Sequence, residues 1–387
     1  MSVTAAQGFR ASGVTAGLKP SGSPDVALVV NDGPDTSAAA VFTSNRCKAN
    51  PVLWSERAIV DGRLDAVVLN SGGANCYNGP EGFQTTHASA ELVAALLGGS
   101  AIDVVVCSTG LIGTPLDRPV LEAGIRSAHG ALSSKGGLAA ARAIMTTDTV
   151  PKEATASAPD GTWVVGGMAK GAGMLAPALA TMLVVITTDA VVDSETADRA
   201  LRAATATTFD RLDTDGCMST NDTVVLMASG ASGVVTDEPT LTGALTAVCA
   251  DLARQLWHDA EGAHHDIEIE ITGAFNEPDA VEVARAVARS NLFKAAVFGN
   301  DPNWGRVLAA IGTTTATFEP DAIDGAINGV EVCRAGGTKL GEPSSSVDLT
   351  PRHVHVCVDL NAGPATATIL TSDLTHDYVH ENSAYST

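Results

Sequence analysis

The chain contains 387 residues, enough for one large or two ordinary domains with buried cores. Its composition, 45% hydrophobic and 17% charged, is that of a compact α/β enzyme rather than of a disordered or fibrous protein. The net charge of −21, from 44 acidic against 23 basic side chains, repels polyanions and argues against nucleic-acid binding. The same field repels small carboxylate metabolites, so a site for such a metabolite needs a local cation.

The cysteines and the apolar segments indicate where the chain works. The longest apolar stretch, residues 175–186, is about half of what a membrane span requires, and the sequence begins without the apolar segment of a signal peptide. Seven scattered cysteines form no C-x-x-C pair, which favours a reducing compartment. We therefore expect a cytoplasmic protein without a membrane segment. The cysteines are Cys47, Cys76, Cys107, Cys217, Cys249, Cys333 and Cys357.

The first third of the chain alternates short apolar runs with helical patterns, which is the rhythm of an α/β protein. These patterns predict buried strands at residues 26–30, 38–43, 66–69 and 104–107, and helices at residues 83–97 and 121–132. Two of the strands lead into glycine-bearing loops, NSGGANCYNGPEG (residues 70–82) and STGLIG (residues 108–113). Glycine lets backbone N–H groups face a ligand, although each loop alone is equally well explained as a tight turn.

The C-terminal part of the chain also mixes helical and strand patterns. Apolar spacing predicts a helix at residues 240–260, and alternation predicts strands at residues 267–271 and 354–360. No repeat or low-complexity linker marks a boundary. We place a division near residue 275, between a main catalytic α/β domain (1–275) and a smaller C-terminal α/β domain (276–387).

The most informative segment is GGMAKGAGMLAPALATMLVVITTDA, residues 166–190. Lys170 lies among its glycines, and the small pair Ala180-Thr181 leads directly into the strand-like run 182–186. A threonine hydroxyl needs a base to become a nucleophile, and its own α-amine can be that base once the preceding bond is cut. Cleavage would begin with attack of the Thr181 oxygen on the Ala180 carbonyl. From the pattern alone, Ala-Thr at the start of a buried strand is usually explained by ordinary packing.

The run KGAGMLAPALATML resembles the self-cleavage segment of the ornithine acetyltransferase (glutamate N-acetyltransferase) family of arginine biosynthesis. The likeness covers nearly the whole chain, and ordered segments in register are far more specific than any single motif. The other matching segments are GF and AGLK near the start, AVFTSN (40–45), VVVCSTGLIG, IMTTDTVPK (144–152), STNDTV (219–224), EGA (261–263), GNDPNWGRV (299–307) and DLTHDYVHENSAYST at the end.

The resemblance implies a layered α/β (α+β) fold of the ArgJ/DmpA-like, self-processing N-terminal-nucleophile kind. It implies cleavage into an α-chain (1–180) and a β-chain (181–387) that remain together as an α2β2 heterotetramer. The implied reaction moves the acetyl group of N2-acetylornithine to glutamate through an acetyl-Thr181 ester, which gives ornithine and N-acetylglutamate. No cofactor or metal is implied, and acetyl-CoA is left open as a second acetyl donor.

The resemblance also assigns site residues. Thr181 is the implied nucleophile, and Thr109 and Gly110 are the implied oxyanion hole. Lys170 supplies the cation that the acidic charge requires, and Arg306 is the next candidate for that task. The implied substrate contacts are Thr147, Lys170, Thr181, Glu261, Asn382 and Thr387.

Three of these contacts carry structural expectations of their own. Glu261 follows a predicted helix, whose dipole disfavours an anion, so we expect it to pair with the ornithine side-chain ammonium. Asn382 and Thr387 lie in the last six residues, so their use implies that the tail folds back over the site.

Two departures from the family pattern are visible. His264-His265 stands where we expect Thr-Lys after EGA, which removes one positive charge near the site. The loop at residues 70–82 differs from the usual asparagine-rich version, although Asn70, Gly72, Asn75 and Cys76 still align.

Two other enzyme classes compete with this interpretation. A zinc site could use Glu261, His264 and His265, or His353, His355, Cys357 and Asp359. No H-E-x-x-H or C-x-x-C spacing is present, so a solvent-facing edge strand and two loop histidines explain them better.

A self-cleaving N-terminal-threonine amidase or aminopeptidase differs only in using water as the acyl acceptor. STGLIG, DPNWGRV and the tail favour the transferase, and a non-enzymatic binding module has no supporting motif.

Overall fold

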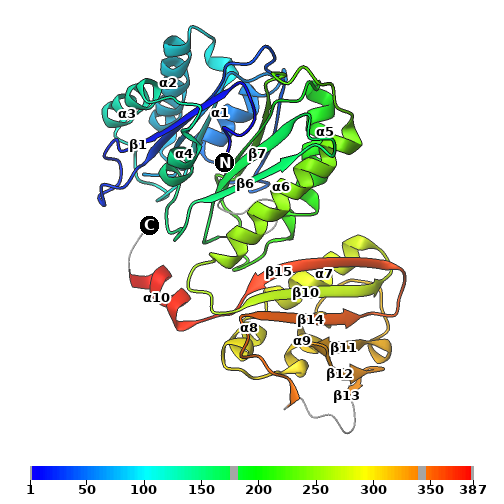
Figure 1. Ribbon diagram of the computed structural model, residues 1–387. Helices are drawn as coiled ribbons and strands as arrows, with labels where there is room; N and C mark the ends of the chain where they lie inside the picture. The colour runs from blue at the N-terminus through cyan, green and yellow to red at the C-terminus, as the bar shows by residue number, and fades with distance from the viewer. Residues whose placement is uncertain (1, 175–181, 339–345, 385–387) are drawn as a thin grey trace.

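The computed structural model describes residues 2–174, 182–338 and 346–384. Two of its three sheets form a first lobe, which contains strands from both halves of the chain. The third sheet forms a second lobe near the C-terminus (Figure 1). The predicted layered α/β fold class is confirmed.

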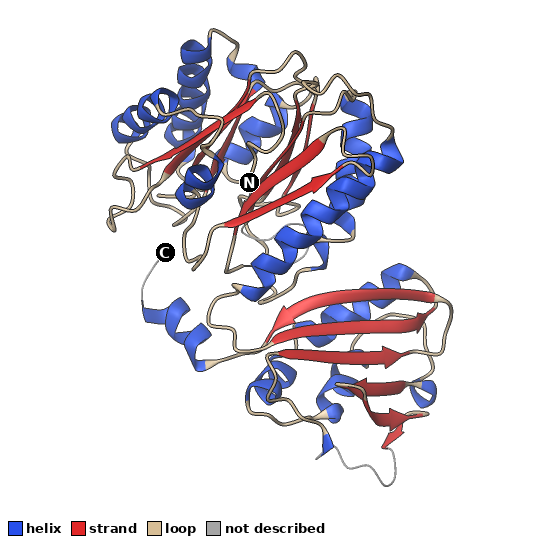
Figure 2. Cartoon of the chain, viewed as in Figure 1, coloured by secondary structure: helices blue, strands red, loops and turns tan. Residues whose placement is uncertain are grey.

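The first lobe has four layers, in which two sheets pack against each other and helices cover their outer faces (Figure 2). The four-stranded sheet has the order β1 (Phe9–Val14), β2 (Val26–Asn31), β4 (Ala66–Asn70), β5 (Val104–Ser108). The five-stranded sheet has the order β3 (Ala38–Phe42), β9 (Thr223–Ala228), β8 (Leu183–Thr188), β7 (Val164–Lys170), β6 (Lys152–Ser157). Strands β4 and β5 are parallel, as are β8 and β9, and all other neighbours in these two sheets are antiparallel.

Helices complete the four layers. Those that pack on the four-stranded sheet are α2 (Gly79–Leu97) and α3 (Arg118–Gly130). Those that pack on the five-stranded sheet are α5 (Ser194–Ala206) and α6 (Glu238–His258). The lobe also contains α1 (Asn50–Ala58), α4 (Gly137–Ala143) and the 3-10 turns η1 (Ala101–Asp103) and η2 (Phe209–Arg211).

Strand β8 shows why its sequence is a continuous apolar run. Side chains alternate along a strand, so Val184 and Ile186 pack against α5 and α6, while Leu183 and Val185 pack between the two sheets. Every residue of β8 is buried. Each apolar side chain buried in this way contributes about 1.5–3 kcal/mol relative to exposure. The strand that follows the predicted cleavage site is therefore fixed from both faces.

The predicted helices are present but begin earlier than hydrophobic spacing indicated. Helix α3 starts at Arg118 rather than 121 because Asp117 caps it, accepting the N–H of Val120 at 3.1 Å. Asp237 caps α6 in the same way, and a proline lies in the first turn of each helix. Hydrophobic periodicity begins only at the first residue that faces the core, whereas the cap sets the true start.

The second lobe is a six-stranded sheet with helices packed against it. Its strand order is β13 (Gly337–Thr338), β12 (Val330–Arg334), β11 (Asp324–Ile327), β14 (His353–Asp359), β10 (Asp266–Ala274), β15 (Ala365–Ser372). Its helices are α7 (Glu277–Ala288), α8 (Asn291–Phe298), α9 (Trp304–Ile311) and the 3-10 turn η3 (Pro320–Ala322). Strand β10 belongs to this sheet, although it lies before residue 275 in the sequence. The domain division near residue 275 stays a prediction.

The edge-strand interpretation of the histidine-bearing strand was wrong, because β14 lies inside the sheet between β11 and β10. Its alternate residues do face outward, and they meet carboxylates of the parallel neighbour β10. His353 Nε2 lies 3.1 Å from Glu268 Oε2, and His355 Nε2 lies 3.0 Å from Glu270 Oε2. No cluster of three or more potential metal ligands occurs within residues 2–174, 182–338 and 346–384.

The tail leaves the second lobe after β15 and forms α10 (His376–Ala384), which lies toward the first lobe (Figure 1). None of the helices in the described parts of the chain combines the length and apolar character needed to cross a bilayer.

Candidate active site

Side chains from distant parts of the sequence meet at a small cavity of about 70 Å³. It includes every predicted site residue that the structure describes; Ala180, Thr181 and Thr387 lie outside the described residues. The residues that line the cavity are Thr109, Gly110, Thr146, Thr147, Lys170, Gly173, Met174, Glu261 and Asn382.

The turn after β5 carries the predicted oxyanion hole. Thr109 is buried, and its carbonyl accepts the N–H of Gly73 at 2.9 Å. Gly110 has a φ of 128°, and a Cβ there would lie 2.8 Å from the Gly73 nitrogen, so only glycine fits. The Gly110 N–H donates no hydrogen bond within the described part of the chain. It is therefore available to a ligand in the cavity that Gly110 lines.

Lys170 is the last residue of β7 and is only 1% exposed. Its Nζ lies 3.3 Å from the Thr109 hydroxyl oxygen, so the cation stands beside the predicted oxyanion donor. Burial lowers the pKa of the Lys170 ammonium below its ordinary value, and the charge of Asp148 opposes that effect. Among the described residues that line this cavity, Lys170 is the one cation, and it is a buried charge supported by a carboxylate.

Asp148 is the supporting carboxylate, and its role was not predicted although IMTTDTVPK was among the matching segments. Its Oδ1 accepts Lys152 Nζ at 2.6 Å and the Gly171 N–H at 2.7 Å. Burial alone would raise the pKa of Asp148, but Lys170 and Lys152 outweigh burial and the pKa lies below its usual value. Asp148 therefore stays ionised between two lysines, and it fixes the backbone directly after Lys170.

Glu261 is fixed from both sides of the cavity. The Thr147 hydroxyl donates to its Oε1 at 2.7 Å, and Asn382 Nδ2, on α10, donates to its Oε2 at 3.0 Å. Its own N–H donates to the Ala172 carbonyl at 3.0 Å. Each carboxylate oxygen retains a lone pair, so this group can accept further N–H donors from a cationic ligand.

The strands on either side of the predicted cleavage site end beside this cavity. Lys170 on β7 is the antiparallel partner of Leu183 on β8, so the chain leaves and re-enters the sheet at the same end. The Met182 N–H, one residue after position 181, donates to Asp222 Oδ1 at 3.1 Å. Met182, the first described residue after the predicted cleavage site, therefore lies at the end of the sheet that carries Lys170.

The unexpected histidines do not line the cavity but connect to the tail. His264 Nε2 lies 2.7 Å from Asp377 Oδ2 on α10. His265 is buried, with Nδ1 2.7 Å from Asp373 Oδ2 and Nε2 2.9 Å from the Leu349 carbonyl.

Arg306, the second candidate cation, donates a hydrogen bond to the Leu292 carbonyl in the second lobe. It is not among the residues that line the cavity.

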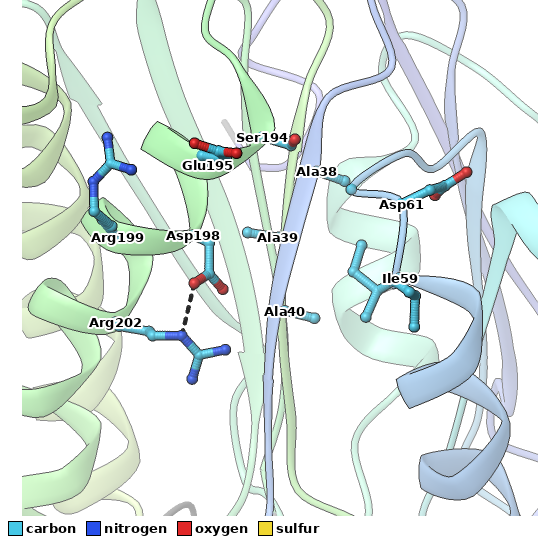
Figure 3. Close-up of a pocket in the computed structure, with 12 residues that line it drawn as sticks. Ala38, Ala39, Ala40, Ile59, Asp61, Ser194, Glu195, Asp198, Arg199 and Arg202 are labelled. Carbon is cyan, nitrogen blue, oxygen red and sulfur yellow. Dashed lines mark hydrogen bonds and ion pairs between the residues drawn. The ribbon is translucent and has the colours of Figure 1, made fainter.

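A larger cavity of about 560 Å³ lies between β3 and α5 (Figure 3). It contains none of the predicted site residues. Its two arginines pair with acidic side chains: Arg202 donates to Asp198 at 2.8 Å and Arg199 to Glu238 at 2.7 Å. Size alone therefore does not identify the reactive site.

The cavity combines an available backbone N–H, a threonine hydroxyl beside a buried lysine, and a carboxylate held by hydrogen bonds. On a four-layered α/β scaffold, this combination defines an acyl-transfer enzyme. The family model described as the ArgJ family matches residues 10–387. The arginine biosynthesis bifunctional protein ArgJ of Streptomyces coelicolor is 62% identical over 386 residues, covering 100% of both chains. The chain belongs to the ArgJ family.

One further relative and one solved structure are similar to this chain. The protein of the same name from Thermobifida fusca is 62% identical over 387 residues, again covering 100% of both chains. A crystal structure of ornithine acetyltransferase complexed with ornithine from Mycobacterium tuberculosis is 53% identical, with a TM-score of 0.45, covering 47% of this chain and 96% of that chain. The family and enzyme class expected from the sequence are confirmed.

Proposed function

We propose that this enzyme transfers the acetyl group of N2-acetylornithine to glutamate through an acetyl-Thr181 ester, giving ornithine and N-acetylglutamate in arginine biosynthesis. Full-length relatives named as bifunctional proteins of arginine biosynthesis support this assignment. The main supporting observation is that Thr109, Gly110, Lys170 and Glu261 line one cavity. The strands that flank position 181, β7 and β8, end beside this cavity.

The first step is self-cleavage. Thr181 Oγ attacks the Ala180 carbonyl carbon, the Ala180–Thr181 C–N bond breaks, and the hydroxyl proton passes to the Thr181 nitrogen. Water then hydrolyses the Ala180 ester, leaving a carboxylate on Ala180 and a free amine on Thr181. The Gly110 N–H and the Thr109 hydroxyl stabilise the oxyanion in each acyl step, and one such donor lowers the barrier by about 3–4 kcal/mol.

Acetyl transfer uses the same groups. The α-carboxylate of N2-acetylornithine binds near Lys170, and its side-chain ammonium binds Glu261. The Thr181 amine takes the hydroxyl proton while Oγ attacks the acetyl carbonyl, and that proton passes to the departing ornithine nitrogen. The glutamate amine then attacks the ester and regenerates the hydroxyl. Lys170 places a positive charge at the cavity of a protein whose net charge is −21.

The two cleaved chains remain associated because their strands interleave. The sheet order β3-β9-β8-β7-β6 places β8 and β9, from residues 181–387, between β3 and β7 from residues 1–180. Hydrogen bonds cross from one chain to the other at both junctions. Cutting one peptide bond in the connection between β7 and β8 leaves this sheet and its core unchanged.

The remaining parts of the assignment rest on the family resemblance and on composition. The cleaved chains assemble as an α2β2 heterotetramer and work in the cytoplasm, where seven free cysteines are stable. The reaction uses no cofactor or metal, since the acetyl group passes between amines through a threonine ester. Acetyl-CoA is a second candidate donor, and N-acetylglutamate formation from acetyl-CoA alone tests that activity.

The test measures both products with and without the acceptor. Wild type with N2-acetylornithine should release ornithine in step with N-acetylglutamate when glutamate is present, and far more slowly without it. Thr181→Ala should remain one chain and lose the activity. Release of ornithine and acetate at equal rates with and without glutamate would instead identify an amidase.

A further inference from the structure

Asn221 contacts the turn that carries the predicted oxyanion hole, although it does not line the cavity. It lies two residues before β9 and is only 3% exposed. Its Nδ2 group donates to the carbonyl of Ser108 at 2.8 Å and to the carbonyl of Ala74 at 2.6 Å. Its Oδ1 atom accepts the Thr220 hydroxyl at 2.6 Å. Both N–H donors and the oxygen of this buried carboxamide are therefore engaged.

The contacts of Asn221 also fix its orientation. A backbone carbonyl can only accept hydrogen bonds, so the side-chain atom that faces two carbonyls must be the nitrogen. The backbone of the same residue is held as well, because its N–H donates to Ser219 Oγ at 3.1 Å and its carbonyl accepts the Thr223 hydroxyl at 3.0 Å. The side chain is therefore a fixed double donor that joins two loops.

The two loops joined by Asn221 also bond to each other. The Gly73 N–H donates to the Thr109 carbonyl at 2.9 Å, and the Thr109 N–H donates to the Asn70 carbonyl at 2.9 Å. The side chain of Asn70 adds two bonds, since it accepts the Ser108 hydroxyl at 2.5 Å and donates to the Gly73 carbonyl at 3.0 Å. The two glycine-bearing loops therefore form one hydrogen-bonded unit.

The planarity of the peptide bond connects these contacts to the Gly110 N–H. In a trans peptide, the carbonyl oxygen and the N–H of the next residue point in opposite directions. The Gly73 N–H binds the Thr109 carbonyl, so it sets the direction of the Gly110 N–H. The preceding peptide is held through the Ser108 carbonyl, which Asn221 binds. Loss of that bond would let this peptide rotate and would displace the oxyanion donor that follows it.

Asn221 and the oxyanion turn come from opposite sides of the proposed cleavage site. Ser108 ends β5 in the four-stranded sheet, whereas Asn221 leads into β9 in the five-stranded sheet. Cleavage would assign Ser108 and Gly110 to residues 1–180 and Asn221 to residues 181–387. The orientation of the donor in one chain would then depend on a side chain of the other.

We propose that Asn221 is a positioning residue that holds the oxyanion turn so that the Gly110 N–H stays directed at the reacting carbonyl oxygen. The proposal deepens the proposed function and rests on it, because that function assigns the Gly110 N–H to the oxyanion. An oxyanion donor acts on charge that develops in the transition state. Its displacement therefore lowers kcat and leaves KM nearly unchanged.

Asn221→Ala tests the proposal because it removes both donors. In the cleaved variant, the KM for N2-acetylornithine should stay within about twofold of wild type while kcat falls about tenfold to a hundredfold. Self-cleavage uses the same donor, so a gel time course should show that it is slower as well. Steady-state kinetics after cleavage is complete measure KM and kcat.

Asn31→Ala is the matched control. Asn31 is a buried asparagine at the end of β2, and its Nδ2 donates to the carbonyls of Asp35 at 2.9 Å and Ala228 at 3.3 Å. The strand pairing places it at the opposite end of the four-stranded sheet from Ser108. Asn31→Ala should lower the melting temperature to a similar extent but leave kcat, KM and the rate of self-cleavage unchanged.

A double variant distinguishes positioning of the turn from loss of stability. Thr109→Ala removes the hydroxyl donor of the same turn. If Asn221 acts through this turn, Asn221→Ala should lower kcat by a smaller factor in the Thr109→Ala background than in wild type, because residues that act together have non-additive effects. An equal factor in both backgrounds would show that Asn221 acts elsewhere and would overturn the proposal.

The outcomes separate this proposal from the function on which it rests. A wild type that transfers no acetyl group, or a Thr109→Ala enzyme of unchanged kcat, would contradict the proposed function or its oxyanion hole. An active wild type whose kcat falls no further in Asn221→Ala than in Asn31→Ala would overturn the role of Asn221 alone. If Asn221→Ala does not accumulate as folded protein, Asn221→Ser keeps one short donor and carries the same test.

Discussion

At the scale of single residues, the site is built from buried charges that support one another. The charge of Asp148 supports the buried Lys170, and Lys152 and the Gly171 N–H keep Asp148 ionised. Removing one member of such a group costs more than the pair contributes, because the partner is left buried and uncompensated. Mutations here should therefore affect geometry as well as charge.

Lys170→Met should raise the KM for N2-acetylornithine and also lower kcat. The substrate carboxylate loses its cation, and a displacement of the acetyl carbonyl by about 1 Å costs around a hundredfold in rate. Steady-state kinetics of the cleaved protein measure both effects, after a denaturing gel has shown that cleavage is complete. Cleaved Lys170→Met with wild-type KM and kcat would show that another group binds the carboxylate.

At the scale of elements, the Thr375 hydroxyl is one of the groups that tie the tail to the site. The Thr375 hydroxyl donates to the Gly262 carbonyl at 2.6 Å and accepts the Tyr378 N–H at 2.9 Å, so it caps α10 and ties it beside Glu261. Gly262 has a φ of 59°, and a Cβ there would lie 2.2 Å from the Tyr378 nitrogen. This close approach brings Asn382 to the carboxylate of Glu261.

Thr375→Val should therefore raise the KM for N2-acetylornithine severalfold and change kcat less. The variant loses both hydrogen bonds, so α10 and its Asn382 donor separate from Glu261 more often. Asp193→Ala is the control, since Asp193 caps α5 far from the site by accepting the Thr196 N–H at 2.8 Å. Each cap contributes about 1 kcal/mol of stability, so equal KM changes in both variants would show that only stability was affected.

Sequence patterns predicted most of the helices and strands, but they did not predict which side chains come together at the cavity. Buried runs such as β2 and β8 are evident because both faces of each strand are covered, which makes the sequence continuously apolar. A short helix such as α4, with glycine at its start, has too few turns to show a period. The role of Asp148 depends on contacts with lysines on two different strands, which no spacing in the sequence reveals.

At the scale of the whole molecule, the site needs both halves of the chain. Thr109 and Lys170 come from residues before the proposed cleavage site, whereas Glu261 and Asn382 come from residues after it. The five-stranded sheet interleaves the two halves, so the proposed cleavage would free the Thr181 amine without separating the groups proposed to act with it. The family resemblance supplied the roles from the sequence, and the sheet order supplies the reason that a cut chain can remain an enzyme.

Intact mass measurement of the enzyme, under native and then denaturing conditions, tests the central claim most directly. The native particle should contain both chains, and denaturation should release residues 1–180 and 181–387. After exposure to N2-acetylornithine without glutamate, the second chain alone should carry one added acetyl group, which glutamate then removes. An intact single chain with full activity, or two chains that turn over without acetyl on residues 181–387 after rapid quenching, would contradict the account.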